Sequence, residues 1–71
     1  MTLDDFKTIL TEFEASQSPR MNLWRRNGYH SVLCRHHETL SIKGDNLLVV
    51  PKDAPEKRLY TAISEIECVS F

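Results

Sequence analysis

The 71-residue sequence has little of what marks phosphate loops, membrane spans or secretion signals. It contains two glycines, and no glycine-rich loop that would cradle phosphate groups is present. Its longest uninterrupted apolar run is "LLVV" at 47–50, far shorter than a membrane-spanning helix or the apolar part of a signal peptide. We therefore expect a soluble, cytoplasmic protein.

Neither sign of charge is in large excess. The formal net charge is -1, which predicts no overall attraction to nucleic acid or to a membrane surface. Apolar residues make up 41% of the chain, enough for a folded domain rather than a disordered segment. A chain of this length is one domain and buries only about 60% of the surface that its unfolded form exposes. Domains this small often depend on disulfides, a metal or association with copies of themselves.

Cysteine is too scarce for a disulfide framework. Cys34 and Cys68 both lie in apolar segments, so we expect two buried, unpaired thiols. The stretch "CRHH" also permits a metal site, because His30, Cys34 and His36 would share one strand face. Zinc usually takes four ligands from closely spaced pairs, and no second pair exists. We therefore expect no metal and no cofactor.

Patterns for catalysis are missing as well. A Cys–His pair needs a positioned base and an oxyanion hole, in a pocket that a chain this small rarely builds. No pair of carboxylates flanks a histidine. We therefore expect a protein that is not an enzyme and that acts by binding.

One helix is predicted, over about residues 3–15. Its apolar residues recur at helical spacing and form a single stripe: Leu3, Phe6, Ile9, Leu10 and Phe13. Thr2, with Asp5 three positions later, has the pattern of a capping box and starts the helix. Pro19 disfavours helical backbone at the residue before it, so the helix ends in "SQSP".

The remainder of the chain is predicted to form strands, at 21–26, 29–43, 47–52, 58–63 and 65–71. Asn27-Gly28 is a strong hairpin signal and closes the first strand. "GDN" makes the next turn, and "DAPEK" is a polar loop. In the second strand the apolar residues from Val32 to Ile42 fall mainly at even positions and would all lie on one face. This constant alternation predicts a single long, bent strand.

The last two strands follow one another without a glycine or a proline between them. A hairpin turn normally requires a residue that accepts positive φ, and only Ser64 is available here. One tight helical turn over 63–65 would connect the strands with negative φ throughout and point Ile63 and Ile66 inward. The last strand would then pair with the first and close a barrel. The predicted fold is α+β and mainly β: a single domain over 1–71, with a helix at about 3–15 and a five-stranded antiparallel small β-barrel over about 20–71.

This pattern resembles the Sm-like fold, and in particular bacterial Hfq, over nearly the whole chain. "FKTILTEFEASQSP" occupies the place of that family's first helix, and "MNLWRRNG" looks like its first strand. "GDNLLVVPK" is similar to its third strand, and "YTAISEI" to the junction of its fourth and fifth strands. Generic SH3-like barrels share most of these features. The resemblance implies single-stranded RNA as the partner. The family's uridine-binding Lys and His are replaced here by Tyr60 and Thr61.

Positive charge is concentrated in residues 20–43, which hold five basic residues and one acidic residue. Basic side chains interspersed with aromatic ones are typical of surfaces that bind unpaired bases. Arg25, Arg26 and Arg35 are expected at the surface, whereas Trp24 is expected in the core. The predicted nucleic-acid contacts are Arg20, Arg25, Arg26, Tyr29, Arg35, Lys43 and Tyr60.

Two functions remain open. The first is an Sm-like RNA-binding protein that forms a homo-oligomer through strands four and five, because "RLYTAI" and "LLVV" are apolar for free strand edges. The second is a small protein-interaction module, an SH3-like adaptor or a viral or accessory regulator. It would bind a host protein, and not RNA, through its acidic helix or a strand edge. The basic segment favours the first function, whereas slight acidity and the missing uridine-binding residues favour the second.

Overall fold

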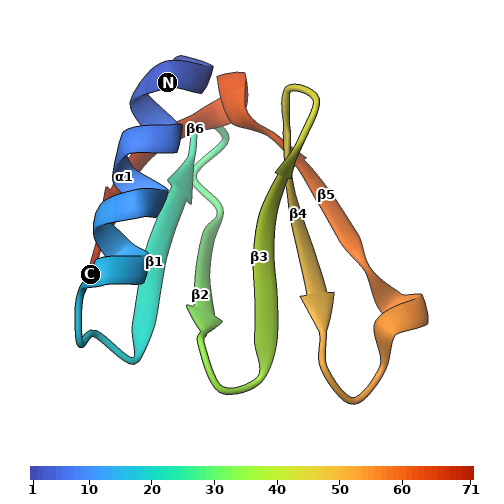
Figure 1. The fold of residues 1–71 in the computed structure, drawn as a ribbon. Coiled ribbons are helices and arrows are strands. Elements are labelled where there is room, and N and C mark those ends of the chain that lie inside the picture. Colours follow the sequence, from blue (N-terminus) through green and yellow to red (C-terminus); the bar gives the residue numbers. More distant parts are fainter.

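The computed structural model describes residues 1–71 as one helix packed against two antiparallel sheets (Figure 1). The elements in chain order are α1 (Leu3–Ala15), β1 (Arg20–Arg25), β2 (His30–Cys34), β3 (Glu38–Lys43), β4 (Asn46–Pro51), the 3₁₀ turn η1 (Pro55–Lys57), β5 (Leu59–Ala62), the 3₁₀ turn η2 (Ile63–Glu65) and β6 (Ile66–Ser70). One sheet has the strand order β2-β1-β6 and the other β3-β4-β5. The predicted class, α+β and mainly β, is confirmed.

The predicted helix is confirmed together with its cap. Thr2 Oγ1 accepts a hydrogen bond from the Asp5 backbone N–H at 3.1 Å, which satisfies one of the N–H groups that a helix start leaves unpaired. At the other end, the backbone N–H and the hydroxyl of Ser16 both donate to the Phe13 carbonyl. Neither α1 nor the two 3₁₀ turns has the length and apolar composition needed to cross a membrane.

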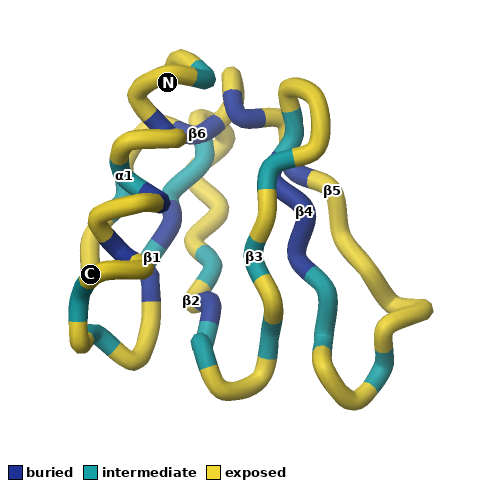
Figure 2. The backbone as a smooth tube through the Cα atoms, in the orientation of Figure 1, coloured by how far each residue is buried: buried dark blue, intermediate teal, exposed yellow.

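The core lies between α1 and the two sheets (Figure 2). Helix, strands and the η2 turn all contribute to it. The largest fully buried side chains are Phe6, Met21, Leu23, Leu47, Ile63 and Ile66. Burying one such side chain stabilises the fold by about 1.5–3 kcal/mol.

The first hairpin forms where Asn27-Gly28 predicts it. Gly28 donates its backbone N–H to the Arg25 carbonyl at 3.0 Å, and Arg25 donates to the Tyr29 carbonyl at 2.9 Å. Gly28 has a φ of 87°, whereas no residue other than glycine has a positive φ. This is a type I turn followed by a glycine in the left-handed region, the usual form of a three-residue hairpin loop.

The junction between the last two strands is also confirmed. Residues 63–65 form η2 with no positive φ. Ile63 and Ile66 are 1% and 0% exposed, so both point inward. β6 then pairs with β1 in antiparallel register.

The single long second strand is a wrong prediction. The chain reverses direction at 35–37, so β2 pairs with β1 and β3 pairs with β4 (Figure 1). The reversal is closed by a hydrogen bond from the His37 N–H to the Cys34 carbonyl at 3.0 Å. The positions that face inward also differ from the prediction, which placed the even positions of this segment on one face. In β2 the odd position Leu33 is buried, while Val32 is 45% exposed.

The five-stranded closed barrel is not formed. Six strands make two open sheets. A continuous strand over 29–43 would have belonged to both sheets and joined them, but the break at 35–37 divides it into β2 and β3. The free edges lie at β2 and β6 in one sheet and at β3 and β5 in the other. The expectation that "LLVV" forms a free edge is therefore wrong, because β4 is the central strand of its sheet.

Candidate nucleic-acid interface

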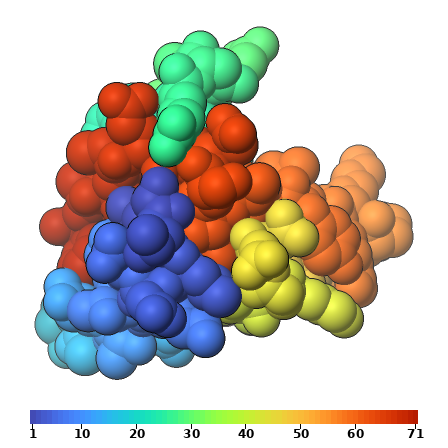
Figure 3. Space-filling view, turned by 90° about the horizontal axis from the view of Figure 1, so that it is seen from above, coloured from blue at the N-terminus to red at the C-terminus, as the bar shows by residue number.

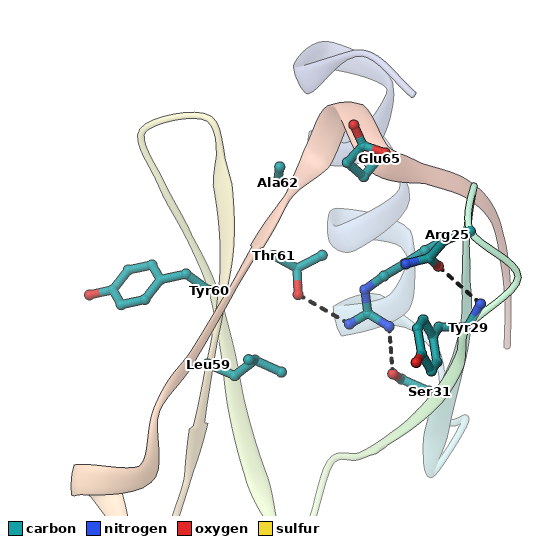
Figure 4. A pocket seen from close by; sticks show the side chains of 9 residues that line it. Arg25, Tyr29, Ser31, Leu59, Tyr60, Thr61, Ala62 and Glu65 are labelled. Atoms are coloured by element: carbon teal, nitrogen blue, oxygen red, sulfur yellow. Dashed lines mark hydrogen bonds between the residues drawn. The ribbon is translucent and has the colours of Figure 1, made fainter.

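A groove of about 490 Å³ lies between the two sheets. One wall comes from the β1–β2 hairpin, and the other comes from β5 and η2 (Figure 4). Three of the seven predicted contact residues line it: Arg25, Tyr29 and Tyr60. The groove therefore joins segments that lie at least 28 positions apart in the sequence.

Arg25 connects the two walls of the groove. The alternation that buries Met21 and Leu23 directs the Arg25 side chain to the same face of β1. Its Nη1 donates to Ser31 Oγ at 2.8 Å and its Nη2 donates to Thr61 Oγ1 at 3.1 Å (Figure 4). The half-buried guanidinium thus bridges β2 and β5 across the two sheets.

The chemistry of this constellation suits an anion. Both acceptors of Arg25 are neutral hydroxyls, and no carboxylate is among its hydrogen-bond partners. Arginine carries five N–H donors and remains protonated, so the positive charge persists in the groove. Ser31 and Thr61 accept from Arg25 and keep their own hydroxyl hydrogens free to donate. A phosphate oxygen would find charge-assisted donors here, although Glu65 also lines the groove and makes that part of it unfavourable for an anion.

Two tyrosines stand on opposite walls of the groove. Tyr29 is 69% exposed at the end of the hairpin turn, and Tyr60 is 48% exposed on β5. In Figure 4 the Tyr29 ring lies beside the Arg25 guanidinium, whereas the Tyr60 ring is directed away from it. An exposed tyrosine ring offers a flat apolar face with a polar tip, which is what base stacking requires.

The other predicted contact residues do not join this groove. Arg20 is exposed at the start of β1, and Lys43 is exposed at the end of β3. Arg26 is exposed in the β1–β2 turn and lines other hollows. The basic segment is therefore not one continuous surface, because its strands belong to two sheets.

Arg35 supports the helix. Its Nε donates to the Ser18 carbonyl at 3.0 Å, and its Nη2 donates to the carbonyls of Phe13 at 2.6 Å and Ser16 at 3.5 Å. The guanidinium carbon also lies 4.3 Å from the centre of the Phe13 ring. A cation at the C-terminus of a helix stabilises its unpaired carbonyls and its dipole.

Of the three arginines expected at the surface, two are placed differently. Arg26 is exposed as predicted, but Arg25 and Arg35 are half-buried and hydrogen-bonded to distant segments. Their combined replacement would damage the fold. The partners of Arg35 lie 17 to 22 positions before it, so no local pattern in the sequence reveals this role.

Trp24 and the two cysteines also differ from expectation. Trp24 is half-buried but lies outside the core, because its alternation places it on the face of β1 opposite Leu23. Cys68, its direct partner on β6, is exposed, and Cys34 is half-buried. Both thiols are free. No group of three or more His, Cys, Asp or Glu side chains comes together to hold a metal.

Two groove residues were missed from the sequence. Thr61 is only 6% exposed and its hydroxyl accepts from Arg25, and Ser31 is its counterpart on β2. Both are polar residues at inward positions of strands. That pattern would have identified them if it had been known which positions of each strand face inward.

Comparison with known proteins adds no relative. No protein-family model, curated protein or solved structure matches the chain. The candidate site therefore depends on its own geometry, a half-buried guanidinium with neutral partners beside the exposed ring of Tyr29.

Proposed function

We propose that the protein is a non-enzymatic RNA-binding module that holds a single strand in the groove between the two sheets. The observation that carries the proposal is the placement of the exposed Tyr29 ring beside the Arg25 guanidinium in this groove. Arg25 would contact a phosphate, and Tyr29 would stack on the neighbouring base. Tyr60, whose ring is directed away from Arg25, would stack on a base only where the strand passes over β5. The groove volume falls within the range of about 300–1,000 Å³ that is typical of small-molecule sites, which leaves room for a nucleotide unit.

Association through the last two strands remains part of this proposal. β5 and β6 each leave one edge unpaired, and Leu59 and Tyr60 are 52% and 48% exposed on β5. Pairing of β5 in one copy with β6 in the next would satisfy these backbone groups and build a ring if the rotation closes. Repeated grooves on one assembly would raise the affinity for a long strand.

A protein-interaction module remains the second candidate, and the same edge supports it. An exposed edge strand with two large apolar side chains can accept an extended segment of a host protein as an additional strand. This function would leave Arg25 as a structural bridge only.

RNA titration at physiological salt separates the two functions. Parent protein should bind a labelled uridine- or adenine-rich strand, and Tyr29→Ala should weaken binding by about 5- to 150-fold, because one base stack contributes about 1–3 kcal/mol. Tyr29 is 69% exposed, so the fold should be retained. Val32→Ala, an exposed position facing away from the groove, is the matched control and should bind like the parent. Binding that disappears near physiological ionic strength in parent and variants alike would contradict RNA binding and leave the interaction module.

A further inference from the structure

The only tryptophan of the chain lies on the outer face of the β2-β1-β6 sheet. The His30 ring stacks on it from β2, with centroids 4.5 Å apart and an angle of 6° between the planes. A ring nitrogen of His30 lies 3.3 Å from Asn22 Oδ1, which fixes the imidazole in place. One face of the indole is therefore covered, and the other is directed toward β6.

A hollow of about 340 Å³ lies on that uncovered side. It is lined by Trp24, Arg25, Arg26, Gly28, Glu67 and Cys68, and His30 is not among them. Arg26 is held close to the end of η2, just before β6 begins, because its backbone N–H donates to the Glu65 carbonyl at 2.9 Å. In Figure 3 the β1–β2 turn, in green, stands out from the body beside the red surface of β6.

An irregularity in β6 places an acidic side chain in this hollow. Trp24 pairs with Cys68 and Arg25 pairs with Ile66, so Glu67 has no partner on β1 and forms a bulge. A bulge redirects the side chain of the extra residue, and Glu67 lines the outer hollow together with Cys68. The result is a carboxylate beside an indole, with the Arg26 cation on the same rim.

We propose that this hollow is a binding site for the guanine base of a nucleotide. The base stacks on the open face of Trp24, as unpaired bases do on aromatic side chains. The Glu67 carboxylate has acceptors only, and guanine alone among the four RNA bases presents two adjacent donors, N1–H and the N2 amino group. Adenine, cytosine and uracil each place an acceptor next to their donor. Arg26 is positioned to contact the phosphate.

Guanine can reach this site as a free nucleotide or as part of an RNA strand. The hollow and the groove between the sheets share Arg25 and lie on the two sides of the β1–β2 turn. A strand that crosses the turn would place one base in each. The guanine site does not depend on the proposed RNA-binding groove, because a mononucleotide is enough to occupy it.

Fluorescence of Trp24 reports directly on this site, because no other tryptophan contributes. Titrations with GMP, AMP, CMP and UMP should give saturable changes, with GMP binding tighter than AMP by about 5- to 150-fold, the range for a two-point contact to one base edge. Glu67→Gln should remove this preference, since the amide presents one donor and one acceptor. Glu56→Gln, on the distant η1 turn, is the matched control and should keep it. Equal dissociation constants for the four nucleotides, or a preference that survives in Glu67→Gln, would overturn the proposal.

Calorimetry extends the test to variants without the tryptophan. Trp24→Leu should lose GMP binding, whereas Trp24→Phe, which keeps an aromatic face, should retain a weaker form of it. Full binding by a folded Trp24→Leu would overturn the site. A strand with one guanine among uridines that binds tighter than both GMP and the all-uridine strand would assign the site to RNA, and a strand that binds no tighter than the all-uridine strand would assign it to the free nucleotide. Tyr29→Ala should leave GMP binding unchanged, so failure of the groove and failure of the guanine site are distinguishable.

Discussion

Replacement of Arg35 by alanine should destabilise the fold. The substitution removes three hydrogen bonds to carbonyls around the end of α1 and the contact with the Phe13 ring. One hydrogen bond from a charged group contributes about 1.5–3 kcal/mol, and one cation–π contact about 0.5–2 kcal/mol. These contributions overlap and the group is only half-buried, so we expect a loss of about 2–4 kcal/mol in the free energy of unfolding.

The loss is large relative to the stability of a domain this small. Stability of about 0.05–0.15 kcal/mol per residue gives roughly 4–11 kcal/mol in total. The melting temperature should therefore fall by roughly 10–30 °C, which thermal and urea unfolding followed by circular dichroism would measure. Arg35→Lys should give an intermediate loss, because lysine keeps the charge but lacks the planar fork of donors.

Arg20→Ala is the matched control, since Arg20 is exposed and donates no side-chain hydrogen bond to the rest of the chain. It should unfold close to the parent temperature. If Arg35→Ala has the same melting temperature as Arg20→Ala, Arg35 does not stabilise the end of the helix.

Three further predictions concern the core, the thiols and the stability of the fold without a metal or a disulfide. Phe6→Ala should cost about 3–5 kcal/mol, because the ring is fully buried, and a melting curve like that of the parent would contradict its place in the core. Cys68 should react with a thiol reagent faster than Cys34, because it is the more exposed of the two, and equal rates would contradict this placement. The protein should keep its circular dichroism spectrum in chelator and in reductant, and loss of the strand signal in either would show that a metal or a disulfide holds the fold.

The features that the sequence predicts correctly depend on local patterns. The helix follows from its apolar stripe and its cap at Thr2, and the first hairpin follows from Asn27-Gly28. The η2 junction follows from the absence of any residue suited to positive φ between the last two strands. Each of these signals lies within a few residues of the structure that it determines.

The features that it does not predict depend on distant contacts. The reversal at 35–37 contains no glycine or proline, and the even positions on its two sides keep the same apolar pattern. The break is stabilised from outside by Arg35, whose guanidinium donates to carbonyls at the end of α1. Within the turn the Glu38 carboxylate adds a local contact, because it accepts from the Cys34 N–H at 3.0 Å. Division of that strand separates the sheets, and this separation in turn creates the groove at Arg25.

The candidate site could be found from the sequence only in part. The mixture of basic and aromatic residues points to Arg25, Tyr29 and Tyr60, but the same pattern gives no information on which arginines face inward. The polar residues at inward strand positions are recognisable only when the register is known.

A nuclear magnetic resonance titration with a short single-stranded RNA at physiological salt tests the central claim most directly. If the groove holds RNA, backbone amide signals of Tyr29, Ser31 and residues 59–62 should shift together and saturate. The signals of the outer residues of α1 should not move, and Tyr29→Ala should require a higher RNA concentration for the same shifts. Absence of shifts, or shifts confined to Arg20, Lys43 or the helix, would contradict an RNA-binding groove between the two sheets.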